Sequence, residues 1–192
     1  MAKRLLDLLV QQFGSEVVVA VHSDRGDDTA CVKADHWLEV ARFLRDDLRC
    51  QMNMLVDLCG VDHFGDAQRL EVVAHVHSLG LGHRLRIKAR VGGRDCDEAR
   101  IASLVSVWPA ANWFERETYD MFGIRFEGHP DPRRILLYEA FEGHPLRKDY
   151  PAQKTQPLVA YREDRLDKLA PFGPDEGMVF GRKHLDYMKR ED

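Results

Sequence analysis

The segment Leu70–Val91, LEVVAHVHSLGLGHRLRIKARV, decides the fold, because it specifies a β-hairpin together with its register. In its second half, apolar residues alternate strictly with basic ones, which is the pattern of an antiparallel strand with one solvated face. A four-residue loop at 79–82 then pairs position 78 with 83, 76 with 85 and 74 with 87. The dry face receives Val76, Leu85, Ala74 and Ile87, while on the wet face His77, His75 and Glu71 lie opposite Arg84, Arg86 and Arg90.

Apolar patterns outside the hairpin predict further strands at 16–22, 29–33 and 54–62. An N-terminal helix is expected to stop at Gly14, with an apolar face made of Leu5, Leu6, Leu9 and Phe13. A second helix is expected after Asp35 as its N-cap, with a stripe made of Trp37, Val40, Ala41, Leu44 and Leu48. A third is expected over 108–122, with Pro109 in its first turn and Gly123 just past its end.

Proline content divides the chain into two parts. Positions 130–174 hold all but one of the 8 prolines, and no long apolar period survives there. We therefore expect an α+β domain over 1–124 and an extended, proline-rich C-terminal arm over 125–192, which would bury too little surface to fold alone. The arm opens with FEGHP at 126–130, which recurs at 141–145, and basic residues follow each copy.

The composition is that of an ordinary globular protein, with 44% hydrophobic and 31% charged residues. A net charge of −4 creates no global field that would recruit nucleic acid or an anionic membrane. No apolar run approaches the roughly 20 residues that span a bilayer, and no cleavage site follows the N-terminal stretch. The chain is therefore expected in the cytoplasm or an equivalent compartment, reaching a membrane only through partners.

No metal site is expected. The cysteines are too widely spaced for the CxxC-type pairs of iron–sulfur and zinc sites, and buried apolar roles are favoured for Cys31, Cys50, Cys59 and Cys96. His75 and His77 share a strand face and could bind a metal, but the arginines opposite them disfavour a cation. The basic face made of Arg84, Arg86, Lys88 and Arg90 could track a phosphate backbone. It lacks interleaved aromatic residues, so a solvated face or a protein contact is favoured over nucleic acid.

The densest constellation of charged residues is the run Glu115–Asp120 on the third helix. One hypothesis makes Glu117 and Asp120 a proton-sharing carboxylate pair, which with His129 could serve a freestanding hydrolase or isomerase. The alternative is a charged helix face in which Arg116 pairs locally with Asp120 or across an interface. That alternative is favoured because no nucleophile or phosphate loop accompanies the acids. The core-facing stripe is expected to be Phe114, Thr118, Met121 and Phe122.

The arm carries basic residues after each FEGHP copy, namely Arg133, Arg134, Arg147 and Lys148. They could bind a phosphate or meet carboxylates on another protein, and arginine is suited to planar bidentate pairing at interfaces. A proline-stiffened segment also loses less entropy on docking than a flexible one. An interface role is therefore the preferred interpretation of the arm.

Two runs in this region, WFERETYDMFGIRFEGHPDPRRIL at 113–136 and GHPLRKDYP at 143–151, resemble the signatures of the C subunit of respiratory complex I, also called its 30 kDa subunit. The resemblance extends more weakly back to about Met54. It implies an α+β fold with a mixed or antiparallel sheet and packed helices. It also implies a place in the hydrophilic arm of the complex, peripheral on the cytoplasmic side of the inner membrane.

In that family the complex passes electrons from NADH through FMN and iron–sulfur clusters to a quinone and pumps protons. The resemblance implies that this chain carries no cofactor, metal or catalytic residue. It also implies contacts with other subunits of the complex, chiefly D, with B and I nearby. The same domain occurs in related membrane-bound hydrogenases and in F420H2- and plastoquinone-linked complexes, which leaves the electron donor open. The interface residues expected from the signatures are Glu115, Arg116, Glu117, Asp120, His129, Arg133, Arg134, His144, Arg147 and Lys148.

Overall fold

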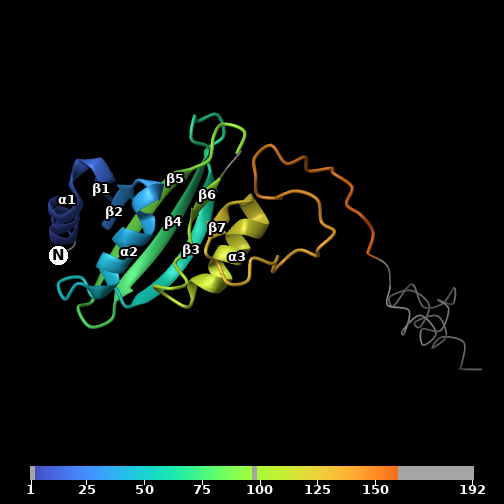
Figure 1. The fold of residues 1–192 in the computed structure, drawn as a ribbon. Helices are drawn as coiled ribbons and strands as arrows, with labels where there is room; N and C mark the ends of the chain where they lie inside the picture. The colour runs from blue at the N-terminus through green and yellow to red at the C-terminus, as the bar shows by residue number, and fades with distance from the viewer. Residues whose placement is uncertain (1–2, 97–98, 160–192) are drawn as a thin grey trace, which may run out of the picture. The chain divides into compact units, whose positions relative to one another are not determined.

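A five-stranded mixed sheet forms the centre of the protein in the computed structural model, which describes residues 3–96 and 99–159 (Figure 1). The strands follow the order β1-β2-β5-β4-β3. The elements of this sheet and its helices are α1 (Lys3–Val17), β1 (Val18–Asp24), β2 (Asp27–Val32), α2 (Trp37–Asp46), β3 (Met54–Asp62), β4 (Leu70–Ser78), β5 (His83–Val91) and α3 (Ala111–Phe122). The expected α+β class is confirmed.

The register of the β4–β5 hairpin is confirmed at each predicted position, from Ser78 opposite His83 to Glu71 opposite Arg90. β3 pairs antiparallel with β4, and β1 pairs antiparallel with β2. β2 instead runs parallel to β5, which makes the sheet mixed. A one-residue slip in the hairpin would exchange its dry and wet faces, so the burial of the dry face holds the register.

All three helices contribute to a core on the dry face of the sheet (Figure 1). Helix α3 packs against β3, where the hydroxyl of Thr118 donates to the carbonyl of Leu58 at 3.4 Å. Leu58 shares the dry face with Ala74, its register partner on β4. Core side chains with no exposed surface include Leu9 of α1, Trp37, Val40 and Leu44 of α2, and Ile87 of β5.

Two predicted details of α2 are wrong. The N-cap of α2 is His36, which follows a short 3-10 turn at Ala34–His36, so Asp35 does not cap the helix. Helix α2 ends at Asp46, and Leu48 lies beyond it with 80% of its surface exposed. Just after the helix, the carboxylate of Asp47 accepts from the backbone amide and the guanidinium of Arg49.

The third helix begins at Ala111 and not at Trp108, because the carbonyl of Leu104 accepts from the amides of Val107 and Trp108 in a separate turn. Gly123 ends the helix in the left-handed region, with φ 77°, as expected. Gly14 also has a positive φ of 70°, but it kinks α1, which continues to Val17.

The buried face of α3 is broader than the predicted stripe. Thr118 is buried, and the half-buried Phe114 and Phe122 pack against the core as expected, whereas Met121 is half-buried and is not part of the core cluster. The buried positions of the helix are Ala111, Glu115, Thr118 and Asp120. Two carboxyl groups therefore face inward, which is possible because segments outside the helix supply their hydrogen-bond donors.

After α3, the strand β7 (Arg125–Glu127) pairs in parallel with β6 (Arg100–Ala102) in a small second sheet. Residues 128–159 contain no helix or strand. We call residues 128–156 the strap; they belong to a compact unit that ends at Gln156. The expected domain division at 124/125 stays a prediction, and residues 160–192 lie outside the described residues. Within the described ranges, no helix has both the length and the apolar composition needed to cross a membrane.

Replacing Gly60 with alanine should destabilise the domain, because the added Cβ would lie 2.6 Å from the Phe122 ring where α3 packs on β3. We expect a loss of about 1–3 kcal/mol in the free energy of unfolding, measured by chemical denaturation. Gly93→Ala is the matched control, since its Cβ would meet no atom within 4 Å. Equal stability of the two variants would contradict the packing described here.

Candidate functional site

Asp120 anchors the strap to α3. Its carboxylate has no exposed surface, and its Oδ1 accepts from the guanidinium of Arg134 at 2.6 Å. Its Oδ2 accepts from three consecutive strap amides, those of Ile135, Leu136 and Leu137, at 3.2, 2.9 and 2.8 Å. Burial alone would raise the pKa of Asp120, but these amides and Arg134 outweigh it and hold the pKa below its usual range. This side chain is therefore an ionised, fully bonded anchor.

The strap also covers the C-terminal end of α3. The ring nitrogen Nδ1 of His144 donates to the carbonyl of Asp120 at 3.0 Å, and Nε of Arg147 donates to the carbonyl of Phe122 at 2.6 Å. Burial lowers the pKa of His144, which favours a neutral ring. These donors meet carbonyls that have no partner within the helix. Gly123 lies beneath them, and a Cβ there would come within 2.6 Å of His144.

A third anchor lies where β3 and β4 meet the end of the strap. The buried guanidinium of Arg69 binds both carboxylate oxygens of Asp62 at 2.7 Å each. The same guanidinium binds Asp149 of the strap at 2.8 and 3.0 Å. Asp62 also accepts from the amide of Lys148 at 2.7 Å. The bond to Arg69 is the main cause that lowers the pKa of both aspartates.

Sequence reasoning missed this third anchor. Asp62 is the last residue of β3, and Arg69 directly precedes β4. The register of these two strands could therefore have placed the two residues near each other. Asp149 is 80 positions from Arg69, and no local pattern connects them. The KDY triplet at 148–150 is the one signal available for it, since it lies inside the second signature.

Arg116 holds the start of the strap from the outside of α3. Its guanidinium donates to the carbonyls of Arg133 and Arg134 at 2.9 and 3.2 Å and lies over the ring of Trp113. Of the two alternatives for Arg116, the local pair with Asp120 does not form, because Asp120 pairs with Arg134. Glu117 is exposed, and both oxygens of Asp120 are occupied by the strap, so these two carboxyl groups do not share a proton.

His129 joins the loop after β7 to the beginning of α3. Its Nδ1 accepts from the amide of Asp131 at 2.9 Å, so the proton must lie on Nε2, which donates to the carbonyl of Asn112 at 3.1 Å. Both ring nitrogens are thereby committed to structural bonds. The ring is not available as a general base for the hypothetical hydrolase or isomerase.

Glu115 is the second inward-facing carboxyl group of α3 and has no exposed surface. It accepts from the hydroxyl of Ser103 and the amide of Leu104, both at 2.6 Å, and so fastens the loop after β6 to the helix. Burial raises its pKa to about 7, partly offset by these two donors. Glu115 therefore changes its charge near neutral pH inside the fold.

The cations proposed for an interface divide into two groups. Arg134 and Arg147 use their guanidinium groups within the chain. Arg133 pairs with Asp131 at 2.8 Å but remains 75% exposed, and the side chain of Lys148 is also exposed. The exposed members can still contact another protein, and the interface role of the set stays a prediction.

On the wet face of the sheet, three of the four side chains of the predicted basic face pair with carboxylates of the same chain, and Arg84 is exposed. Arg86, Lys88 and Arg90 form ion pairs with Asp27, Glu71 and Asp66 respectively. His75 lies opposite Arg86 as predicted, and no cluster of three metal-ligating side chains occurs in residues 3–96 and 99–159. The cysteines in this part of the chain are free; Cys50 and Cys96 are buried as predicted, whereas Cys31 and Cys59 are half-buried.

A mixed-sheet α+β domain with a strap held by buried carboxylates is the class of protein that this fold defines. The model of the family described as respiratory-chain NADH dehydrogenase, 30 Kd subunit, matches residues 30–156. The chain belongs to this family, and the resemblance found in its sequence is confirmed. The matched range includes all three strap anchors.

Relatives agree with this assignment, and a solved structure shares the fold. The chain is 46% identical over 144 residues to the C subunit of the NADH-quinone oxidoreductase of Hyphomonas neptunium. The aligned region covers 75% of this chain and 66% of that relative. The chain is 50% identical over 146 residues to the equivalent C subunit of Cupriavidus pinatubonensis, covering 74% and 70%. A polypeptide in the membrane-bound sulfane sulfur reductase, an archaeal respiratory membrane complex, shares the fold with a TM-score of 0.60 at 22% identity. The superposition covers 91% of this chain and 96% of that polypeptide.

Asp120→Asn should loosen the strap, because an amide nitrogen would then face donors that now bind a carboxylate. We expect the amides of Ile135, Leu136 and Leu137 to exchange with solvent about 100-fold faster, equivalent to about 3 kcal/mol. Hydrogen–deuterium exchange measures this. Glu117→Gln is the control, since it removes the same charge from an exposed position of the same helix. Unchanged exchange in Asp120→Asn would contradict the anchor.

Glu115 should make the stability of the domain depend on pH. Its folded pKa of about 7 lies above the ordinary 4.5, so the folded state binds the proton more tightly. The resulting stabilisation is present in acid and is lost as pH rises from about 4.5 through about 7. Between pH 5 and 8, the wild type should lose about 2–3 kcal/mol of unfolding free energy relative to Glu115→Gln, measured by denaturation. Parallel pH profiles would refute this.

Proposed function

We propose that the chain is the C subunit of a proton-translocating NADH:quinone oxidoreductase and acts there as a scaffold without a redox centre. The observation that carries this proposal is the family match over 30–156, which takes in the sheet from β2 onward, α3 and the strap. Relatives at 46% and 50% identity bear the name of the C subunit of NADH-quinone oxidoreductase. These names do not favour the alternative of a related hydrogenase or an F420H2- or plastoquinone-linked complex.

The proposal places the chain in the peripheral arm, on the cytoplasmic side of the membrane, with the D subunit as its main contact and the B and I subunits nearby. Membrane association would come only through the complex. A strap already ordered by its anchors supports this role, because a preorganised surface loses less entropy on docking. Exposed charged side chains of α3 and the strap, among them Glu117, Arg133 and Lys148, can contact those partners.

We further propose that FMN and the iron–sulfur clusters belong to the partner subunits. The chemistry of the thiols supports this assignment, because the thiolate is the form that binds metal. Burial raises the pKa of Cys50 to about 11, and it also raises the pKa of Cys31, Cys59 and Cys96. A metal would have to displace a more tightly held proton from each of these thiols than from an ordinary one, which disfavours cluster binding at these positions.

A tagged copy tests this function directly. It should retrieve an NADH-oxidising, flavin-containing assembly from membranes, and the chain purified alone should be colourless. Mass spectrometry of the retrieved polypeptides would identify the D, B and I subunits. Retrieval of no other respiratory subunit, or a soluble activity of the isolated chain, would overturn the proposal.

Arg133→Ala and Arg134→Ala should separate docking from folding. Arg133 is exposed, so its loss should lower the yield of assembled complex on native gels while leaving the melting temperature of the isolated chain unchanged. Arg134 neutralises the buried Asp120, so its loss should destabilise the strap by about 3 kcal/mol. Arg42→Ala, at an exposed position of α2, is the control. Full assembly of Arg133→Ala would contradict the docking role of this side chain.

A further inference from the structure

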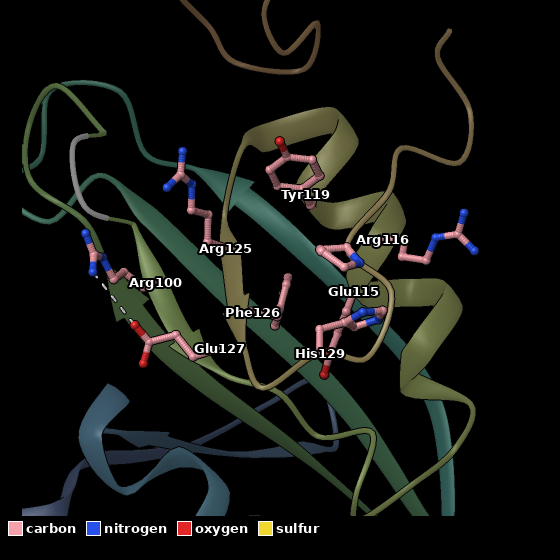
Figure 2. Close-up of a pocket in the computed structure, with 9 residues that line it drawn as sticks. Arg100, Glu115, Arg116, Tyr119, Arg125, Phe126, Glu127 and His129 are labelled. Carbon is pink, nitrogen blue, oxygen red and sulfur yellow. Dashed lines mark ion pairs between the residues drawn. The ribbon is translucent and has the colours of Figure 1, made fainter. Parts of the chain in front are cut away.

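A cavity of about 440 Å³ opens between α3, the β6–β7 pair and the beginning of the strap (Figure 2). Arg100 and Arg125 line it from the two strands, Tyr119 from the helix, and Phe126 and Pro132 provide apolar wall. The residues of the three strap anchors do not line this cavity.

The cavity carries more positive than negative charge. Arg100 and Arg125 are register partners in parallel strands, so they lie side by side on the same face of the pair. Glu127, two positions after Arg125, approaches Arg100 at 3.9 Å, and both partners are more than half exposed. An exposed ion pair of this kind contributes little to stability, and either side chain can readily pair with another charged group instead. Among the described residues, Arg125 has no carboxylate partner at all.

The other charged groups of the lining do not neutralise Arg125. The carboxyl group of Glu115 is buried and already bound to Ser103 and Leu104. Arg116 points away from the cavity toward the strap carbonyls (Figure 2). The hydroxyl of Tyr119 has no hydrogen-bond partner among the described residues, and it points to the same side as the guanidinium of Arg125 (Figure 2).

This set of groups fits a carboxylate better than a phosphate. A guanidinium binds a carboxylate through two parallel hydrogen bonds, and a phenol can add a third. Phosphate sites usually use a helix N-terminus or a nest of backbone amides. The cavity instead meets α3 in its middle, at residues 115, 116 and 119, four or more positions after the helix begins.

We propose that this cavity receives an acidic side chain, a glutamate or aspartate of another subunit, with Arg125 as its principal partner and Arg100 and Tyr119 beside it. The proposal rests on the proposed function, because it takes the occupant from a neighbouring polypeptide of the respiratory complex. The incoming carboxylate pairs with Arg125 and competes with Glu127 for Arg100. Pro132 provides apolar wall for the stem of the acidic side chain.

Charge reversal tests the site in the assembled complex. Arg125→Glu should lower the fraction of complex that retains the chain at physiological salt by about tenfold, whereas Arg125→Lys should lower it less. Arg42→Glu makes the same charge change at an exposed position of α2 and should assemble normally. The isolated Arg125→Glu chain should keep its melting temperature, since no ion pair in the described part of the chain is lost. Assembly of Arg125→Glu at the level of Arg42→Glu would overturn the proposal.

A zero-length cross-link identifies the occupant. The amine of Arg125→Lys, treated with a carbodiimide within the purified complex, should form an amide with an aspartate or glutamate of another subunit, located by mass spectrometry. A cross-link confined to an acid of the same chain, or none, would overturn the proposal. A response of the isolated chain to inorganic phosphate that Arg125→Glu abolishes, without any effect on assembly, would also overturn it in favour of a small-anion site. Failure of the wild type to enter the complex would instead refute the proposed function.

Discussion

The buried carboxylate of Asp120 is the constraint on which the C-terminal part of the structure depends. An ionised group without exposed surface costs several kcal/mol unless hydrogen bonds and an opposite charge compensate for it. The strap supplies that compensation through the guanidinium of Arg134 and three consecutive amides. Residues 128–156 contain no helix or strand, so these bonds in turn define the conformation of the strap. Helix and strap are therefore interdependent, and the Asp62–Arg69–Asp149 cluster holds the far end of the same segment.

The cations of the described part of the chain have two roles: some bind acceptors within the protein, and others are exposed at its surface. Arg134, Arg147 and Arg69 are committed to internal acceptors and hold the strap in place. Arg133, Lys148 and Arg125 remain at the surface, where a partner can reach them. The proposed scaffold role needs both kinds, because a surface that is ordered before docking can present its exposed charges in a fixed arrangement. The family match over 30–156 covers both groups.

Sequence reasoning succeeded where a feature depended on neighbouring positions. The alternation in β5 and the length of the loop before it predicted the whole β4–β5 register, and Gly123 marked the end of α3 correctly. It failed where charge partners decided the outcome. Helical spacing allowed Arg116 to pair with Asp120, but the guanidinium of Arg116 donates to carbonyls of the strap, and Asp120 pairs with Arg134. The predicted stripe of α3 packs against the core at Phe114, Thr118 and Phe122, but it omitted Glu115 and Asp120, which polar donors from outside the helix allow to be buried.

The amino-acid sequence by itself determined the α+β class, the hairpin register and the family, because a period of two residues and two contiguous signatures are local properties. Only the tertiary structure decided which charges pair inside the protein and which face outward. The bond between Arg134 and Asp120 spans 14 positions, and the one between Arg69 and Asp149 spans 80. Such pairs arise when packing excludes water from a carboxylate and leaves one guanidinium within reach. That exclusion is a property of the folded chain, and no spacing along the sequence encodes it.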